Sequence, residues 1–591
     1  MFGGVVGGAQ GAAVGPGLGF EPVVERVLAA RGWREAGSAR AFCEPRLTGL
    51  HDPSLMPGLD RGAERLLGAL DAGERIAIYG DYDVDGVAAS AVLFRALEAA
   101  RPGSAAGGRL LTYVPDRLEE GYGLNAGALA GLAARGASVV VSVDCGITAV
   151  EPARAARGMG LDLIITDHHN LPGDSAGLPD ALSVVHPRLA CPGGGAGYPF
   201  GELCGAGVAF KLAWRVASLA AGSARVGEPM REVLLDCLSL AGLATIADIV
   251  PLVGENRVIA RHGLARLRST GIVGLGALLE ASGLAGERVT AEHAGFVLGP
   301  RLNACGRMGH AREAVELLTT EDAARAGAIA SELCAQNEAR RETERRIFER
   351  AAALVTERGL DGPGSRSIVL ADAGWHPGVI GIVCSRLVQA FGRPTVLLCL
   401  EEDGSAKGSG RSVEGYDLHG ALGACAEHLE SFGGHDMAAG LRVRAGRVEA
   451  FAEALGAHAA CLLSEEDLLP SASPDCDATI DELTPLSVTQ LEGLGPFGRG
   501  NPKPLLRLRG VAVERSETMG ARGKHLSLRV RAGGRSMRLV GWSRGAWAGE
   551  LRSGDRLDAL VTPKINRWNG RTSVEGEVAD VMVVRDGVGV G

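Results

Sequence analysis

Acidic residues and histidines follow short apolar segments at four places in the chain. These are GDYDVDG with Asp81, Asp83 and Asp85, SVDCGI with Asp144, TDHHN with Asp167, His168 and His169, and ADIVPL with Asp248. Mixed sets of carboxylates and imidazoles suit Mn²⁺ or Mg²⁺ and often hold two ions. Two ions about 3.5–4 Å apart can hold the attacking and leaving oxygens of a phosphoryl transfer. The residue types therefore point to metal-dependent phosphodiester chemistry.

Each segment also has a simpler interpretation. GDYDVDG is similar to the start of an EF-hand loop, but that loop needs Glu at its twelfth position, where this chain has Val92. Asp144 or Asp248 alone is typical of a helix cap. Adjacent histidines project in different directions, so one can bind a metal while the other faces substrate. No G-x-S-x-G elbow and no P-loop occur, which disfavours acyl transfer and ATP hydrolysis.

The elements around these segments predict a parallel sheet. Strand, loop and helix alternate, with strands at 76–79, 137–143 and 161–166, the loop GDYDVDG at 80–86 and a helix over 87–100. Ligands of such sheets gather at the carboxyl ends of the strands. We therefore expect Asp81, Asp83, Asp144, His168 and Asp248 to converge from separate strand ends.

The remainder of the chain predicts further domains. Residues 205–330 are mostly helical, and 320–358 predict a long charged helix, interpreted as a solvated spacer. Residues 366–465 predict a second α/β domain that opens with the strand SIVLAD. From about 480 onward, five short strands separated by turns predict a small β-barrel.

Composition sets limits on these predictions. The 591 residues suit about four domains, and 46% apolar with 22% charged residues excludes a wholly disordered chain. The 88 glycines follow no Gly-X-Y period, which excludes collagen. No apolar run is long enough to predict a transmembrane helix, the first residues make a poor signal peptide, and the 12 cysteines form no CxxC. The expected compartment is the cytoplasm, with no membrane partner.

Charge is distributed unevenly along the chain. The net charge is −9, yet from Arg499 to Gly591 there are 18 Lys and Arg against 9 Asp and Glu. This asymmetry predicts a basic binding module attached to an acidic body.

The four acidic segments, in this order, resemble the signature motifs of the DHH phosphoesterase superfamily. Further segments resemble the RecJ family of bacterial 5′→3′ exonucleases specific for single strands: VPDRLEEGYGL, GPRLNACGRM, GWHPGVIGIVCSRL, GSGRSVEGYDLHGAL, FGGHDMAAGL and PFGRGNPKP. The resemblance covers residues 25–585 and implies an α/β multidomain fold. The domains implied are a flexible Gly-rich tail (1–20), a helical segment (21–72), a parallel-sheet DHH catalytic domain (73–319), a linking helix (320–358), an α/β DHH-associated domain (359–467) and an OB-fold barrel (468–591).

The resemblance also implies roles at the predicted metal site. The metal ligands would be Asp81, Asp83, Asp144, His168 and Asp248. His169 would contact the scissile phosphate or its leaving group, Asp167 would orient the histidines, and Asp85 would have a supporting role. Where the family has Asn-Pro after the DHH motif, this chain has His186-Pro187.

Strand contacts are expected in three regions. Arginine matches phosphate oxygens, although a surface or ion-pairing role is a reasonable alternative for Arg307 and a weaker one for Arg301. A glycine pair lets backbone approach a phosphate. A basic groove with stacking aromatics is how OB-folds hold single strands. The predicted contacts are Arg117, Arg301, Asn303, Arg307, Arg411, Ser412, Gly433, Gly434, His435, Lys524, His525, Lys564, Arg567 and the loop-borne Trp568, accompanied by Arg529, Arg571 and Trp542. For Trp542, a core position is an equal alternative.

The implied function is release of 5′-mononucleotides from single-stranded DNA with a free 5′ end, in recombination and mismatch repair, with Mn²⁺ or Mg²⁺. A helicase and a single-strand-binding protein are the implied partners. Two alternatives stay open. One is another DHH phosphodiesterase, such as an oligoribonuclease or a cyclic-dinucleotide hydrolase, which usually lacks the basic C-terminal region. The other is a non-catalytic scaffold, which loses acidic motif residues that are all present here.

Overall fold

The computed structural model describes residues 18–584 apart from 106, 118, 174–176, 191–196, 469–471 and 569. The chain divides into two compact units. The barrel unit comprises residues up to His51, Ile249–His262 and the chain from 471 on. The two-sheet unit comprises Asp52–Asp248 and the chain from Gly263 to 470. Most of the predicted tail, residues 1–17, lies outside the described residues.

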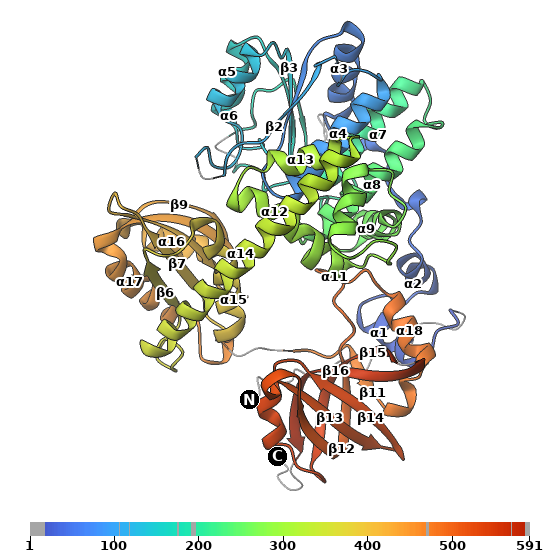
Figure 1. The fold of residues 1–591 in the computed structure, drawn as a ribbon, viewed down its shortest axis with the longest axis vertical. Coiled ribbons are helices and arrows are strands. Elements are labelled where there is room, and N and C mark those ends of the chain that lie inside the picture. The colour runs from blue at the N-terminus through green and yellow to red at the C-terminus, as the bar shows by residue number, and fades with distance from the viewer. Residues whose placement is uncertain are drawn as a thin grey trace. The chain divides into compact units, whose positions relative to one another are not determined.

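The first sheet of the two-sheet unit is parallel, as the sequence predicts. Its order is β2 (Leu110–Tyr113), β1 (Ile76–Tyr79), β3 (Val139–Val143), β4 (Asp162–Thr166) and β5 (Ser183–Val185). The inner strands are almost wholly buried, because helices cover both faces. In Figure 1, α5 (Ala126–Ala134) and α6 (Val150–Gly158) lie on one face, with α3 (Leu59–Ala72), α4 (Val84–Ala100) and α7 (Gly205–Ala221) on the other. The short outer strands β2 and β5 were not predicted.

The first acidic loop is shorter than the sequence indicates. Helix α4 begins at Val84, so Asp85 and Gly86 belong to its first turn rather than to a loop that ends at residue 86. The cause is the Asp83 side chain, whose Oδ1 accepts hydrogen bonds from the backbone N–H groups of Asp85 (2.8 Å) and Gly86 (3.2 Å). Such an N-cap starts the helix three residues earlier than expected.

Residues 205–330 are helical, as predicted. After α7 come α8 (Met230–Ala247), α9 (Gly254–Leu267), α10 (Val273–Ala281), α11 (Ala291–His293), α12 (Gly299–Met308) and α13 (Arg312–Thr319). A π-helical turn, η3 (Ala294–Leu298), leads directly into α12.

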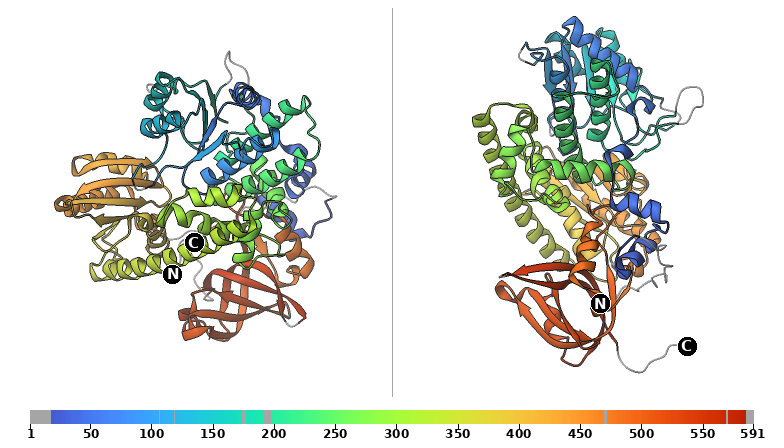
Figure 2. Two further views of the ribbon diagram at one scale, coloured as in Figure 1. Left: turned by 45° about the horizontal axis from the view of Figure 1, so that its top comes forward. Right: turned by 90° about the vertical axis from the view of Figure 1, so that its right-hand side faces the viewer.

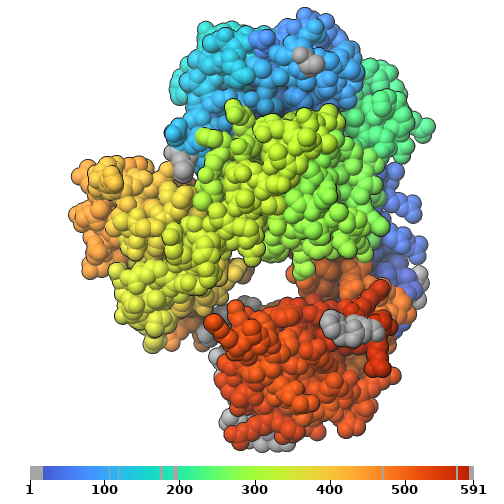
Figure 3. Space-filling model, in the orientation of Figure 1, coloured from blue at the N-terminus to red at the C-terminus, as the bar shows by residue number. Residues whose placement is uncertain are grey.

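The long helix α14 (Ala323–Glu357) exists, but it is not a solvated spacer. Buried side chains recur at intervals of three or four residues along one face, including Ala326, Ile329, Leu333, Ile347, Ala351 and Leu354. This face packs against α10, α12 and α13, and then against α15 (Pro377–Phe391). In the space-filling view, α14 and its neighbours continue without a break into the second α/β domain (Figure 3). The high charge of the exposed face concealed the apolar stripe in the sequence.

The second sheet has the order β6 (Ile368–Asp372), β7 (Thr395–Leu400), β8 (Ser405–Arg411), β10 (Ala438–Arg444) and β9 (Leu429–His435). Only β6 and β7 are parallel, and β9 is an edge strand. The helices of this domain are α15, α16 (Leu418–Ala424) and α17 (Val448–Leu462). The predicted second α/β domain is thus present, with a mixed sheet.

The barrel unit contains the predicted C-terminal barrel. Its strands are β11 (Cys476–Ala478), β12 (Leu506–Met519), β13 (His525–Ala532), β14 (Arg535–Gly541), β15 (Arg556–Trp568) and β16 (Arg571–Val584). Pairing of β12 with β15 closes the sheet into a barrel, which Figure 2 shows from two further sides. Three of these strands are 13 or 14 residues long, not short as expected. Local bulges let such strands bend around a small core.

The N-terminal helical segment divides between the two units. Helices α1 (Pro22–Ala30), α2 (Ala36–Cys43) and α18 (Pro485–Gly493) share the hydrophobic core of the barrel, whereas α3 packs on the first sheet. Arg31 fastens α1 with two bonds to the carboxylate of Asp475, at 2.7 and 2.9 Å. Leu18 and Phe20 also pack against this core, so the predicted tail ends before residue 18.

Among the described residues, no helix is both long and apolar enough to cross a membrane. The described cysteines are all free thiols.

Candidate metal centre at the edge of the first sheet

The carboxyl edge of the first sheet gathers the predicted ligands. Asp81 and Asp83 follow β1, Asp144 follows β3, and His168 follows β4. Asp248 comes from a different kind of element than expected, because it caps the C-terminal end of helix α8 rather than a strand. The sequence ADIVPL does not reveal this helix end, because the apolar residues after Asp248 are equally typical of a strand.

Seven side chains form one cluster at this edge. Three sets could each hold an ion, with their ligand atoms within 4.8 Å of one another: Asp81, Asp83 and Asp144; Asp85, His168 and Asp248; Asp144, His168 and His169. The sets overlap through Asp144 and His168. Every predicted ligand therefore belongs to the cluster.

Asp144 has an unusual backbone conformation. Its φ is +62°, in the left-handed region, which Asp tolerates better than most residues. The first residue of α7, Gly205, leaves room for its side chain, because a Cβ there would lie 2.4 Å from Asp144 Oδ1. Strained backbone of this kind is concentrated at functional sites.

Two buried carboxylate oxygens of the cluster accept no hydrogen bond from the described residues. Asp81 Oδ1 and Asp144 Oδ1 accept no hydrogen bond in the described part of the chain, although His168 Nε2 lies 3.1 Å from the latter. Burial and the neighbouring charge of Asp83 raise the pKa of Asp81, and burial with the charges of Asp85 and Asp83 raises the pKa of Asp144. Orphaned, mutually repelling carboxylates are what a divalent cation would satisfy, so the residues present fit a metal ion.

His168 has the state that a metal ligand needs. Its Nε2 lies 3.1 Å from Asp144 Oδ1 and 3.8 Å from Asp248 Oδ2. Burial lowers the pKa of His168 despite the surrounding carboxylates. A neutral imidazole can offer a lone pair to a cation.

Asp85 is engaged in holding the scaffold. Its two oxygens accept hydrogen bonds from the backbone N–H groups of Gly205 (2.6 Å) and Ala206 (2.8 Å). It therefore ties α4 to the first turn of α7, where a negative charge is favoured by the helix dipole. This geometry agrees with the supporting role expected of it.

The ring nitrogen Nδ1 of His169 has two partners, Asp167 and Tyr122. Asp167 Oδ1 lies 2.7 Å from His169 Nδ1 and also accepts the backbone N–H groups of His168 and His169. Burial alone would lower the pKa of His169, but the hydrogen bond and charge of Asp167 outweigh it and raise the pKa. Conversely, the bond from His169 holds the pKa of Asp167 at about 2 despite burial.

Tyr122 is the partner that sequence reasoning missed. Its hydroxyl lies 3.0 Å from His169 Nδ1 and 3.3 Å from the carbonyl oxygen of Asp144. Its segment, VPDRLEEGYGL, was singled out in the sequence for Arg117 alone, because a tyrosine in a loop does not by itself indicate a chemical role.

Several predicted arginines converge beside the cluster. The guanidinium of Arg117 lies over the ring of Tyr82, 4.8 Å from its centre. Burial lowers the pKa of Arg307 to about 9, assisted by the charges of Arg117, Arg340 and Arg411. Arg340 is also paired with Glu344 at 2.9 Å, whereas Arg117, Arg307 and Arg411 bring three further positive charges together, and such a group of cations suits a polyanionic ligand. Arg340, on α14, was not predicted because the charged helix was interpreted as a spacer.

Other residues of the two-sheet unit that were predicted to contact the strand form hydrogen bonds within the fold. Arg301 donates to the carbonyl of Val297 at 2.8 Å, and Asn303 Oδ1 accepts the N–H of Val84 at 3.0 Å. Ser412 is 4% exposed and donates its hydroxyl to the carbonyl of Tyr416. The Ser412 hydroxyl is thus already bonded within the fold, and its contact with a strand stays a prediction.

Gly433, Gly434 and His435 lie in the edge strand β9. All three are exposed. Gly434 has φ +139°, and a Cβ there would lie 2.4 Å from the carbonyl of Ala438. The strand's free edge leaves backbone amides available to a ligand.

The barrel carries the remaining predicted contacts. Trp542 is 49% exposed, which excludes the core alternative, with His525 packed edge-on at 5.0 Å and Lys564 Nζ 5.5 Å from its ring. Arg567 is exposed on β15. Trp568 is the last residue of β15, paired with Arg571 across the hairpin, rather than loop-borne. Lys524 directly precedes β13.

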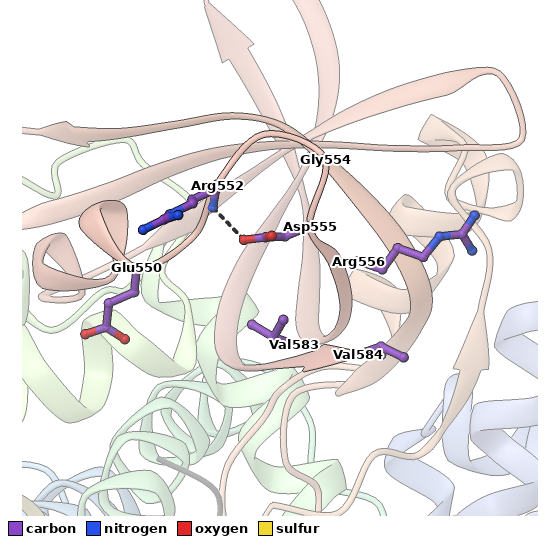
Figure 4. Close-up of a pocket in the computed structure, with 7 residues that line it drawn as sticks. All are labelled: Glu550, Arg552, Gly554, Asp555, Arg556, Val583 and Val584. Atoms are coloured by element: carbon purple, nitrogen blue, oxygen red, sulfur yellow. Dashed lines mark hydrogen bonds between the residues drawn. The ribbon is translucent and has the colours of Figure 1, made fainter. Parts of the chain in front are cut away.

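One surface cavity of the barrel unit contains none of these residues. It measures about 520 Å³ and is lined by Glu550, Arg552, Gly554, Asp555, Arg556, Val583 and Val584 (Figure 4). Asp555 accepts a hydrogen bond from the backbone N–H of Arg552 there, so its carboxylate stabilises the turn between these two residues.

Comparisons with known proteins agree with this architecture. Family models match at residues 75–242 (DHH family, N-terminal domain), 364–460 (DHHA1 domain) and 474–580 (RecJ OB domain). The "Single-stranded-DNA-specific exonuclease RecJ" of Bacillus subtilis is 39% identical over 567 residues, 96% of this chain and 68% of its own. The protein of that name from Thermus thermophilus is 34% identical, over 90% of this chain and 72% of its own.

Solved structures extend the agreement. A crystal structure of RecJ with Mn²⁺ from Thermus thermophilus has a TM-score of 0.79 at 30% identity, covering 97% of this chain and 78% of that chain. The same protein with Mg²⁺ has a TM-score of 0.74 at 30% identity, covering 96% and 77%. With three domain types in order and a relative 39% identical over 96% of this chain, the chain belongs to the RecJ family.

Proposed function

We propose that the protein is a 5′→3′ exonuclease that hydrolyses single-stranded DNA and releases 5′-mononucleotides. The observation that carries this is the pair of orphaned carboxylate oxygens, on Asp81 and Asp144, beside a cluster of arginines. The relatives' names, single-stranded-DNA-specific exonuclease, support the substrate.

Asp81, Asp83, Asp144, His168 and Asp248 would hold Mn²⁺ or Mg²⁺, as two ions. Such ions activate water and stabilise the charge that develops on the phosphate oxygens. The overlapping ligand sets support more than one ion.

The chain's own residues supply the rest of the chemistry. His169, with its raised pKa, can carry a proton to the leaving oxygen, while Asp167 and Tyr122 fix its ring. Arg117, Arg307 and Arg411 would bind the terminal phosphate, and the exposed edge of β9 would contact the next one.

The barrel would hold the strand farther from its end. Trp542 offers a stacking face, with Lys564 and His525 beside it. We also propose that the enzyme acts in the cytoplasm, in recombination and mismatch repair, with a helicase and a single-strand-binding protein.

The experiment uses an internally labelled single strand with Mn²⁺, carrying a block at the 5′ end, at the 3′ end or at neither. Mononucleotide release that only the 5′ block abolishes is the expected result. Turnover of dinucleotides or cyclic dinucleotides without attack on the long strand would favour the other DHH phosphodiesterases. Binding without cleavage would identify a scaffold.

A further inference from the structure

His186 is a fully buried histidine that the proposed chemistry does not use. It follows β5 and uses both ring nitrogens. Nδ1 accepts the backbone N–H of Arg188 at 3.0 Å, and Nε2 lies 2.8 Å from the carbonyl oxygen of His169. Because a backbone N–H only donates and a carbonyl only accepts, the ring is neutral with its proton on Nε2.

Arg188 strengthens the same attachment. Its guanidinium donates to Asn170 Oδ1 at 3.1 Å and to the carbonyl of His168 at 3.4 Å. His186 and Arg188 therefore hold the backbone carbonyls of His168 and His169, together with the side chain of Asn170. Asp167 and Tyr122 hold the His169 ring, whereas His186 holds its carbonyl group.

We propose that His186 is a positioning residue for His169, acting through the hydrogen bond from Nε2 to the His169 carbonyl. The inference rests on the proposed function. A rotation of the peptide that follows His169 would redirect the imidazole relative to the scissile bond, and small misplacements of catalytic groups are costly.

Two substitutions can separate the two hydrogen bonds of His186. An Asn amide can replace Nδ1 as the acceptor for Arg188, but it ends short of the position of Nε2. Gln has the opposite property, because its amide nitrogen reaches the position of Nε2.

The test compares His186→Ala, His186→Asn and His186→Gln, with His458→Ala as control. His458 makes a comparable bond, to the Tyr416 hydroxyl at 3.0 Å, in the second α/β domain. We expect kcat on a single strand to fall about 10–100-fold in the Ala and Asn variants with KM unchanged, as for residues that orient active-site groups. Gln should recover most of the loss, and His458→Ala should behave as wild type.

Strand affinity without metal, measured by fluorescence anisotropy, should be the same in all four variants. Wild-type kcat in His186→Ala would overturn the inference, and so would equal kcat in the Asn and Gln variants. The Asn–Gln contrast decides the matter even if the Ala variant fails to fold. Failure of the wild type to release nucleotides would instead refute the proposed function itself.

Discussion

At the scale of residues, the site is defined by charges that the fold brings together without neutralising them. Asp81 and Asp144 each keep a buried oxygen without a hydrogen-bond partner in the described chain. Asp83 and Asp85, in contrast, also cap helices. The same acidic motif therefore supplies candidate metal ligands and also bonds to the first turns of two helices.

The pair of Asp167 and His169 gives the site a defined pH range. The pKa of Asp167 is lowered from 3.8 to about 2, so its contribution to stability is present above 3.8 and lost as the pH falls through 2. The pKa of His169 is raised from 6.5, so its contribution is present below 6.5 and lost as the pH rises through the raised value. The ion pair is thus strongest between about 4 and 6.5.

Replacing Asp167 with Asn should move the pH profile. Without the carboxylate, burial dominates and the pKa of His169 falls. If protonated His169 assists the leaving group, kcat/KM should decline at lower pH in Asp167→Asn than in wild type. Measured pH–rate profiles check this, and superimposable basic limbs would contradict the role of the pair.

The candidate ligands could be singled out from the sequence because their types and order are distinctive. The sequence could not predict Tyr122 as a partner of His169, since a tyrosine in a loop carries no chemical signature of its own. It also placed Asp248 on a strand, because four apolar neighbours do not distinguish a strand from a helix end.

At the scale of elements, substitutions of the two adjacent glycines of β9 can distinguish a role in binding from a role in folding. A Cβ on Gly433 would meet nothing within 4 Å, whereas one on Gly434 would meet the Ala438 carbonyl at 2.4 Å. If strand backbone approaches this edge, Gly433→Val should weaken binding of single strands while the melting temperature stays unchanged. Gly434→Ala should lower the melting temperature. Unchanged affinity in Gly433→Val would argue against the edge as a contact.

Helix α14 is a second element with a testable role. Ile347 is 1% exposed, so Ile347→Ala should destabilise the protein by about 2–5 kcal/mol through a cavity. Arg346→Ala, exposed on the same helix, should change stability by less than about 0.5 kcal/mol. Urea unfolding measures both, and a negligible effect of Ile347→Ala would restore the spacer interpretation.

Elements with a strong hydrophobic periodicity could be predicted from the sequence, whereas very short strands could not. Strands β2 and β5 have three or four residues and little apolar pattern of their own. They form because β1 and β4 each present a backbone edge to which a further strand can bond. A short window of sequence around β2 or β5 does not contain this information.

At the scale of the whole molecule, each unit is assembled from distant parts of the chain. Helices α1 and α2 join a barrel built from residues more than 400 positions later. The sequence predicted the barrel itself from alternation and turns. It could not predict this partnership, because the apolar face of a short helix does not specify what covers it.

Substitutions in the barrel should affect the binding of long single strands only. Trp542→Ala should weaken binding of a long single strand by about 1–3 kcal/mol through lost stacking, without changing dinucleotide hydrolysis. Lys564→Gln should reduce the slope of log affinity against log salt concentration by about 0.7. Leu486→Ala, an exposed apolar control on α18, should have no effect. Equal losses on dinucleotides would contradict a separate strand-holding role.

The most direct test of the account measures mononucleotide release from a labelled single strand by the wild type and by Asp144→Asn, with and without Mn²⁺, alongside a matched duplex. The account predicts release by the wild type from the single strand only, dependent on Mn²⁺. Asp144→Asn should bind the strand with unchanged affinity but release nothing. Metal-independent release, or comparable release by Asp144→Asn, would contradict the claim that the acidic edge of the first sheet performs the hydrolysis.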